Sequence, residues 1–133
     1  MVIENKTDCC FPKKLRLLRT TEFRHVYAQR QSVANGPLVM YGSRQVNRLN
    51  HVRFGISVSR RVGNAVVRNQ WKRKLREAFR NAKAEFLEDF DVVIVVRASG
   101  APPTGKKSAQ EMTQLLLCLF GRLRTKIRHS ERA

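Results

Sequence analysis

The stretch between residues 64 and 86 can bury one side of itself only as an α-helix. Its apolar residues recur at three- and four-residue spacings, and at about 100° per residue they fall within an arc of roughly 120°. These residues are Val67, Trp71, Leu75, Ala78, Phe79, Ala82 and Phe86. The pattern predicts a helix that runs to about Phe86 and ends near Glu88 and Asp89.

The neighbouring arc of the same helix is almost solidly basic. It carries Arg68, Asn69, Lys72, Arg73, Arg76, Arg80 and Lys83. Like charges four residues apart repel, so this row destabilises the isolated helix. Solvated helix faces normally mix acids with bases, yet Glu77 is the only acid between residues 60 and 83. A polyanionic partner explains this face better than solvation alone.

Composition places the helix in one basic, folded domain. The chain has 133 residues, a formal net charge of +17 and 42% hydrophobic residues, which argues against a disordered basic tail. Such a protein meets nucleic acid or an anionic membrane surface. We expect a flexible segment at residues 1–10, one domain at 11–127 and a basic tail at 128–133. No apolar run approaches the roughly 18 residues of a membrane span, and no secretory signal is present, so we expect a cytoplasmic protein.

The side chains of the sequence show no pattern typical of a catalytic site or a metal site. The three cysteines and three histidines lack zinc-ligand spacing, and there are no paired carboxylates and no nucleophile–base set. These residues are Cys9, Cys10, Cys118, His25, His51 and His129. We therefore expect no catalytic residue and no metal ligand in the protein. A membrane-surface helix is also disfavoured, because the apolar face of the basic helix is needed for the core.

Strands flank the basic helix on both sides. Residues 53–59 alternate between an apolar face and a small, polar one, which predicts a strand. Gly63 permits the positive φ that a tight turn often needs, and Asn64 is the expected N-cap. The β-branched run at 92–96 predicts a strand buried on both faces. Strand, helix and strand indicate a parallel βαβ pair, which is right-handed in nearly all proteins.

The remaining chain predicts two further helices and one more strand. Thr20 or Thr21 can cap a short helix in which Phe23, Val26 and Tyr27 share a face. Residues 38–41 read as a strand, residues 44–50 as a hairpin or loop, and residues 100–105 as a loop. A capping box at residues 108–111 opens a last helix. Its apolar side holds Met112, Leu115, Leu116, Leu119, Phe120, Leu123 and Ile127.

Two strings, residues 61–73 across the turn and the basic helix and residues 76–80 within that helix, resemble the signature of the bacterial ribonuclease P protein component. Flanking matches extend the resemblance over roughly residues 11–125. They are Phe11-Pro12-Lys13, Leu15-Arg16-Leu17, Phe23, Tyr27, Ser32-Val33-Ala34-Asn35, Tyr41 and Phe54-Gly55-Ile56-Ser57-Val58-Ser59. One departure is Gln70, which stands where the family usually has arginine and lies outside the basic arc.

The resemblance implies an α+β fold and a shared enzymatic role. The fold would be a single-domain α-β sandwich in the order α-β-β-β-α-β-α, with a left-handed βαβ crossover around the basic helix. The catalytic RNA subunit, with Mg²⁺, would cut precursor tRNA to make the mature 5′ end. The protein would be the accessory subunit of this endoribonuclease and would bind the catalytic RNA and the 5′ leader.

The resemblance also implies two binding surfaces. The catalytic RNA would meet Arg68, Asn69, Lys72, Arg73, Arg76 and Arg80, mostly through phosphates. The single-stranded leader would lie in a cleft of Phe23, Tyr27, Tyr41, Ser57, Ser59, Arg60 and Arg61, where aromatic rings stack on unpaired bases. Taken alone, Phe23 and Tyr27 also fit an ordinary core stripe of a helix.

Two other functions share the same charge pattern. A ribosomal-type structural RNA-binding protein would have the basic surface without a leader cleft. A DNA-binding module would use residues 68–80 as a recognition helix in a major groove. Since the resemblance points to RNA, we expect no DNA partner and no membrane partner.

Overall fold

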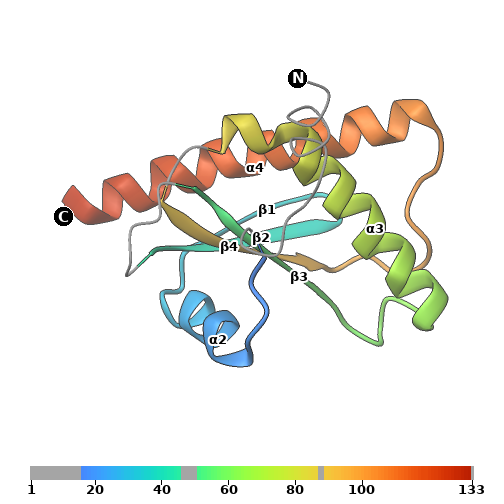
Figure 1. Ribbon diagram of the computed structural model, residues 1–133, viewed down its shortest axis with the longest axis horizontal. Helices are drawn as coiled ribbons and strands as arrows, with labels where there is room; N and C mark the ends of the chain where they lie inside the picture. Colours follow the sequence, from blue (N-terminus) through green and yellow to red (C-terminus); the bar gives the residue numbers. More distant parts are fainter. Residues whose placement is uncertain (1–15, 46–50, 87–88, 133) are drawn as a thin grey trace, which may run out of the picture.

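The computed structural model describes residues 16–45, 51–86 and 89–132, which form an α+β fold (Figure 1). The elements are α2 (Thr20–Ala28), β1 (Ser32–Asn35), β2 (Leu38–Arg44), β3 (Arg53–Val58), α3 (Ala65–Ala82), the 3₁₀ turn η2 (Lys83–Glu85), β4 (Phe90–Val96) and α4 (Lys106–Arg132). This order confirms the predicted α-β-β-β-α-β-α sequence. Residues 1–10 and most of the loop predicted at 44–50 lie outside the described residues.

One four-stranded sheet organises the fold, with the strand order β1-β2-β4-β3. β2 runs antiparallel to β1 and β4, whereas β3 and β4 are parallel, with Ile56 opposite Ile94. The predicted parallel βαβ pair is therefore confirmed, with α3 as its connection. The left-handed sense of that connection stays an expectation from the resemblance. The pattern of the sequence did not predict β1, which has only four residues.

Helices cover both faces of the sheet: α3 and α4 lie on one face, and α2 lies on the other (Figure 1). Alternate residues of β4 divide between the two sides. Phe90, Val92, Ile94 and Val96 join the large core beneath α3 and α4. Val93 instead joins a small core with Leu17 and Val26 of the α2 side. Because every residue of β4 except Val95 is buried, the predicted two-sided burial of this strand is confirmed.

Two predicted helix starts are wrong. α2 is preceded by Arg19 rather than capped by a threonine, because the Glu22 carboxylate accepts from the backbone N–H of Arg19 at 3.0 Å. α4 begins at Lys106, before the predicted capping box. Ser108 is already inside the helix, and its hydroxyl donates to the carbonyl of Gly105 at 2.7 Å. At the start of both helices, another side-chain or backbone contact replaces the cap that the sequence predicts.

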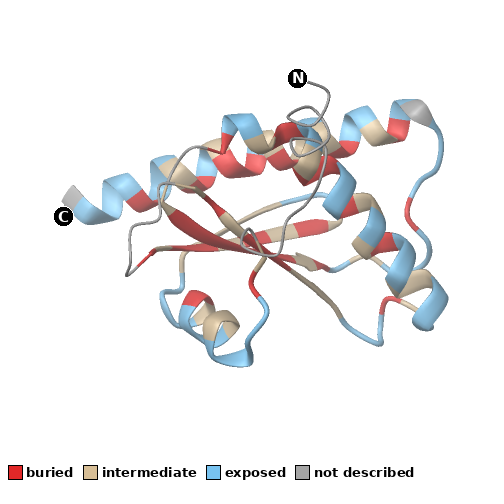
Figure 2. Ribbon diagram, viewed as in Figure 1, coloured by how far each residue is buried: buried red, intermediate tan, exposed pale blue. Residues whose placement is uncertain are grey.

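α4 is a single long helix that passes through Gly121 and continues to Arg132, across the expected boundary at residue 127. Six of its seven predicted apolar residues are buried, and Leu115 is half-buried. Figure 2 shows buried residues concentrated along the sheet and the inner sides of α3 and α4. Within the described ranges, no helix has the length and apolarity that crossing a membrane requires.

Candidate nucleic-acid interface

The start of α3 is fixed by a side-chain cap. The backbone N–H of Val67 donates to Asn64 Oδ1 at 3.0 Å, as predicted. The predicted positive φ at Gly63 is wrong, because only Gly36, Gly100 and Gly105 among the described glycines have one. Gly63 serves close packing instead: a Cβ there would lie 2.7 Å from Val67 Cγ1. The turn thus needs glycine for space rather than for a left-handed backbone.

The apolar side of α3 is anchored in the large core. Trp71, Leu75 and Phe79 are buried, and Phe79 stacks on Phe54 of β3 with 4.4 Å between ring centroids. The Trp71 indole Nε1–H donates to the carbonyl of Gly100 at 2.8 Å. These contacts fix the rotation of α3 about its axis, so its basic side must face away from the core.

The basic side of α3 presents its cations without neutralisation. Asn69, Arg73 and Arg76 are exposed, while Arg68, Lys72 and Arg80 are half-buried. In the part of the chain that the structure describes, the only carboxylate within 4.0 Å of these six side chains is Glu77, at 4.0 Å from Arg80. We call these six residues the α3 face. The structure brings them together as predicted.

Lys74 belongs to the opposite side of α3. Its ammonium donates to the carbonyl of Pro103 and, at 2.6 Å, to Ser108 Oγ. Lys74 therefore ties α3 to the loop before α4 and to the first turn of that helix. This cation has a structural role and is not part of the α3 face.

Four of the seven predicted cleft residues meet on the α2 side of the sheet. Tyr27 of α2 and Tyr41 of β2 contact each other edge to face, with 5.0 Å between centroids and 88° between planes. Burial raises the pKa of Tyr27, a hydrogen bond with the Ser57 side chain opposes this, and the nearby Tyr41 adds to the rise. Phe23 packs against Gly55, where a Cβ would lie 2.7 Å from Phe23 Cζ. We call Phe23, Tyr27, Tyr41 and Ser57 the aromatic cleft.

The aromatic cleft is a mixture of core and surface. Phe23, Tyr27 and Tyr41 pack against the small core, yet each stays half-buried rather than buried. The core-stripe interpretation is therefore correct for one side of these rings. Part of each of these residues stays exposed, and a planar ligand could stack there.

The other three predicted cleft residues lie in the turn between β3 and α3. Ser59, Arg60 and Arg61 are all exposed, and the turn is closed by a hydrogen bond from Val62 N–H to the Ser59 carbonyl at 3.1 Å. The turn joins the strand that carries Ser57 to the helix that carries the α3 face. Its arginines thus follow the aromatic cleft along the chain and precede the α3 face.

A small hollow connects the two surfaces. It has a volume of about 120 Å³ and lies between residues 16–18, β3 and α3. Phe23 and Gly55 line it from the cleft side, and Lys72 and Arg76 line it from the α3 face. Residues 16–18 are held beside β3 by a hydrogen bond from Leu17 N–H to the Phe54 carbonyl at 3.1 Å. Arg16 also lines the hollow, and sequence reasoning gave it no role.

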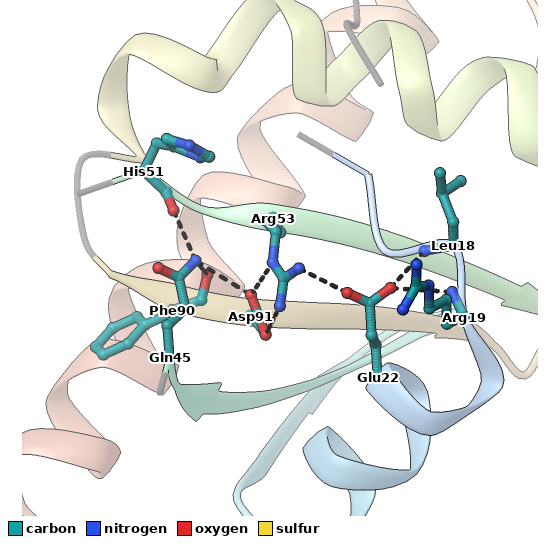
Figure 3. A network of polar contacts seen from close by, with 8 residues as sticks. All are labelled: Leu18, Arg19, Glu22, Gln45, His51, Arg53, Phe90 and Asp91. Carbon is teal, nitrogen blue, oxygen red and sulfur yellow. Dashed lines mark hydrogen bonds and ion pairs between the residues drawn. The ribbon is translucent and has the colours of Figure 1, made fainter. Parts of the chain in front are cut away.

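The sequence also did not predict an ionic network at the base of the aromatic cleft (Figure 3). Arg53 of β3 donates to both carboxylate oxygens of Asp91, at 2.8 and 2.6 Å, and to Glu22 of α2 at 2.6 Å. The other Glu22 oxygen accepts from the backbone N–H of Leu18 and Arg19 at 3.1 and 3.0 Å. One carboxylate thus joins α2, the segment before it and the sheet.

The charges of this network stabilise each other. Burial raises the pKa of Glu22, but the backbone N–H groups of Arg19 and Leu18 and the Arg53 guanidinium outweigh burial, so its pKa is lowered. The hydrogen bonds that Arg53 donates to Asp91 raise the pKa of Arg53, against the effect of burial. In the sequence, the only signals of this network were the charge of Arg53 on the polar face of β3 and the acid Asp91 in the buried strand β4.

The described residues do not fit a resident metal ion. They contain no group of three or more His, Cys, Asp or Glu side chains arranged to hold one. Two of the acids near the sheet are already paired, Asp91 with Arg53 and Asp89 with Arg44. No reaction step can therefore be assigned to a metal held by these side chains.

Known proteins of one family have a sequence similar to that of this chain. The family model described as "Ribonuclease P" matches residues 11–120. The ribonuclease P protein component of Exiguobacterium sibiricum is 39% identical over 110 residues, which cover 83% of this chain and 90% of that protein. The Streptococcus pneumoniae protein of the same name is 41% identical over 85 residues, 64% of this chain and 68% of that one.

Solved structures give the same result. The Staphylococcus aureus RNase P protein superposes with a TM-score of 0.68 at 29% identity, covering 85% of this chain and 97% of that one. The Thermotoga maritima RNase P protein superposes with a TM-score of 0.61 at 28% identity, covering 78% and 94%. The fold and the sequence motif thus lead to one group of proteins.

Proposed function

Because the chain belongs to the ribonuclease P protein family, a subunit role in tRNA 5′-end processing follows, and we propose that its two surfaces bind different RNAs. The α3 face would bind the catalytic RNA subunit. The aromatic cleft, with the turn residues Ser59, Arg60 and Arg61, would bind the 5′ leader of precursor tRNA. In bacterial ribonuclease P the RNA is catalytic, so this chain is the accessory protein subunit of an endoribonuclease.

The observation that carries the proposal is the uncompensated charge of the α3 face. Arg68, Lys72, Arg76 and Arg80 repel one another along one row, at a cost of roughly 0.2–0.5 kcal/mol per pair. The core fixes the opposite side of the helix, so this row cannot turn away from solvent. Phosphates of a folded RNA would relieve the repulsion, and each arginine can donate to a phosphate with two N–H groups.

The aromatic cleft supports the second half of the proposal. Half-buried rings beside a hydroxyl-bearing strand suit unpaired bases, since stacking tolerates any base and is worth roughly 1–3 kcal/mol per base. Lys72 and Arg76 of the α3 face line the hollow between the two surfaces, together with Phe23 of the aromatic cleft. A leader lying in the cleft would therefore pass close to the RNA bound by α3.

The reaction itself would belong to the RNA. We propose that Mg²⁺ acts through the RNA subunit, because the described side chains offer no ligand set for it. The protein would hold the substrate leader and steady the complex. A role in tRNA processing would place the protein in the cytoplasm, as the sequence predicts.

Reconstitution with the catalytic RNA of the same organism tests this function. Cleavage of precursor tRNA at low Mg²⁺ should depend on the protein, and affinity should rise with leader length until the cleft is filled. Cleavage that is unchanged by the protein would contradict the proposal. Affinity that is independent of leader length would instead favour a ribosomal-type RNA-binding protein.

A further inference from the structure

The edge of the sheet farthest from β3 carries a basic surface of its own. Within the described ranges, β1 is an edge strand that pairs with β2 alone. The Gln31 carbonyl accepts from Gly42 N–H of β2 at 3.0 Å, so the alternating backbone groups of Ser32 and Ala34 point away from β2. Unpaired edge groups of this kind are open to other partners.

Three cations are fixed along this edge. Lys126 Nζ donates to the Ser32 carbonyl at 2.8 Å, and Arg122 Nη1 donates to the Ala34 carbonyl at 3.1 Å. Arg97 Nε donates to the carbonyl of Gly36, two residues further, at 2.8 Å. Ser32 and Ala34 are alternate residues of β1 and lie about 7 Å apart, whereas Gly36 lies in the turn after β1, so two cations follow the strand and the third lies at its end. We call Arg97, Arg122 and Lys126 the edge track.

An open groove of about 1000 Å³ lies beside the edge track, between β1 and α4. Val33 and Leu117 give it an apolar floor, and His129 adds a basic group near Lys126. Gly121 faces it without a side chain, and a Cβ there would meet no atom within 4 Å. The groove therefore gives an extended chain access to Arg122 and Lys126, which both line it.

The charge of the edge track is available to a partner. All three side chains are exposed, and in the described ranges none has a carboxylate within 4.0 Å. Each arginine uses one N–H on a carbonyl, and its guanidinium has further donors. Because the backbone already holds the cations in place, a polyanion would lose less side-chain entropy on binding them than on binding free lysines.

Protection of the edge strand explains only part of this arrangement. Charged side chains commonly keep edge strands from pairing with other chains. Blocking a carbonyl requires a donor, however, and a glutamine amide is also a donor. A positive charge that is repeated along the strand can also bind an anion, and glutamine substitution tests this role because it removes the charge.

We propose that the edge track binds the sugar–phosphate backbone of an RNA strand, as a third RNA surface. The inference rests on the RNA-binding role proposed above, but on neither of its two surfaces. RNA is the favoured occupant because it supplies a row of phosphates, and the whole chain carries +17. β1 and β3 are opposite edges of the sheet, so the bound strand is a different segment from the one on α3.

Binding as a function of salt tests the proposal. The variant R97Q/R122Q/K126Q keeps donors but loses three charges. Its affinity for the catalytic RNA, or for precursor tRNA, should depend less steeply on KCl, with the log–log slope falling by roughly 0.7–0.9 for each lost contact. Arg122→Gln should lower the slope by the amount expected for about one contact. Arg24→Gln, which replaces an exposed arginine of α2, should leave the slope unchanged. Leader-length discrimination should be unaffected.

Cys118 allows a local test, because this exposed free thiol lines the groove. In a C9S/C10S background, a photo-crosslinker on Cys118 should label RNA, and labelling should fall in the triple variant. Separate reactions with catalytic RNA and with precursor tRNA identify which one supplies the strand. Labelling by neither RNA, or full labelling of the triple variant, would overturn the proposal.

Two outcomes separate this inference from the proposed function. An unchanged salt slope with new self-association of the triple variant would assign edge protection alone and overturn the edge track. A reduced salt slope for the triple variant, together with a wild-type slope for R68A/R76A, would support RNA binding by the edge track and contradict RNA binding by the α3 face.

Discussion

The Tyr27 and Tyr41 rings meet edge to face, 5.0 Å apart and nearly perpendicular. This contact leaves ring surfaces that the partner does not cover, beside the Ser57 hydroxyl. An RNA base stacked there would add a third ring to the pair. The contacts bring α2, β2 and β3 together, so Tyr27 is the most direct probe of the leader role proposed for the cleft.

Replacing Tyr27 by alanine should weaken binding of precursor tRNA more than binding of mature tRNA. The expected difference is about 1–3 kcal/mol, the value of one base stacked on an aromatic ring. Equilibrium binding of both RNAs measures it. Tyr27→Phe is the matched control, because it keeps the ring and removes only the hydroxyl. Equal losses for both RNAs would indicate a folding defect and contradict a leader role.

Replacing Arg53 by methionine should destabilise the fold by about 3 kcal/mol. Asp91 is buried, and removing its partner leaves an unpaired charge in the sheet. Urea unfolding measures the free energy. Arg53→Lys should lose less, since it keeps the charge but not both hydrogen bonds to Asp91. A free energy of unfolding within about 0.5 kcal/mol of wild type would contradict a structural role for this pair.

Acid should weaken the contact of α2 with the sheet. The folded-state pKa of Glu22 lies below its ordinary value of 4.5, so its contribution is fully present above that value. Stability is then lost as pH falls through the lower, folded-state pKa. Unfolding curves between pH 7 and pH 3 should show this loss in the wild type and a smaller one in Glu22→Gln. Identical pH profiles would show that Glu22 is not linked to folding.

Replacing Gly63 by alanine should cost about 1–3 kcal/mol, the usual price of overpacking. The new methyl group would lie 2.7 Å from Val67 Cγ1, and the β-branched valine cannot move aside. The double variant G63A/V67A should recover part of the loss. Thermal unfolding of G63A, V67A and G63A/V67A measures the coupling. A single variant as stable as wild type would show that the turn has room.

Structural features that depend on the local spacing of residues can be predicted from the sequence. The apolar and basic sides of α3, the Asn64 cap and the buried strand β4 are all correct. Three of the errors have local causes of another kind: Glu22 replaces a threonine cap, Ser108 bonds backward to Gly105, and Gly63 gives space rather than a positive φ. Each depends on one contact among several that the same residues allow.

The sequence could not predict contacts between distant segments. Arg53 lies 31 residues from Glu22 and 38 from Asp91, so their network exists only once α2 and β4 both meet β3. The hollow between the cleft and the α3 face depends in the same way on residues 16–18 beside β3. The family resemblance anticipated the grouping of Phe23, Tyr27, Tyr41 and Ser57. Whether RNA occupies it stays a prediction.

The salt dependence of binding to the catalytic RNA tests the central claim most directly. R68A/R76A should bind more weakly and with a smaller log–log slope, by roughly 0.7–0.9 for each lost phosphate contact. Arg24→Ala, which removes one exposed charge from α2, should leave the slope unchanged. A slope for R68A/R76A equal to that of wild type would contradict the account, because the RNA would then lie elsewhere than on the α3 face.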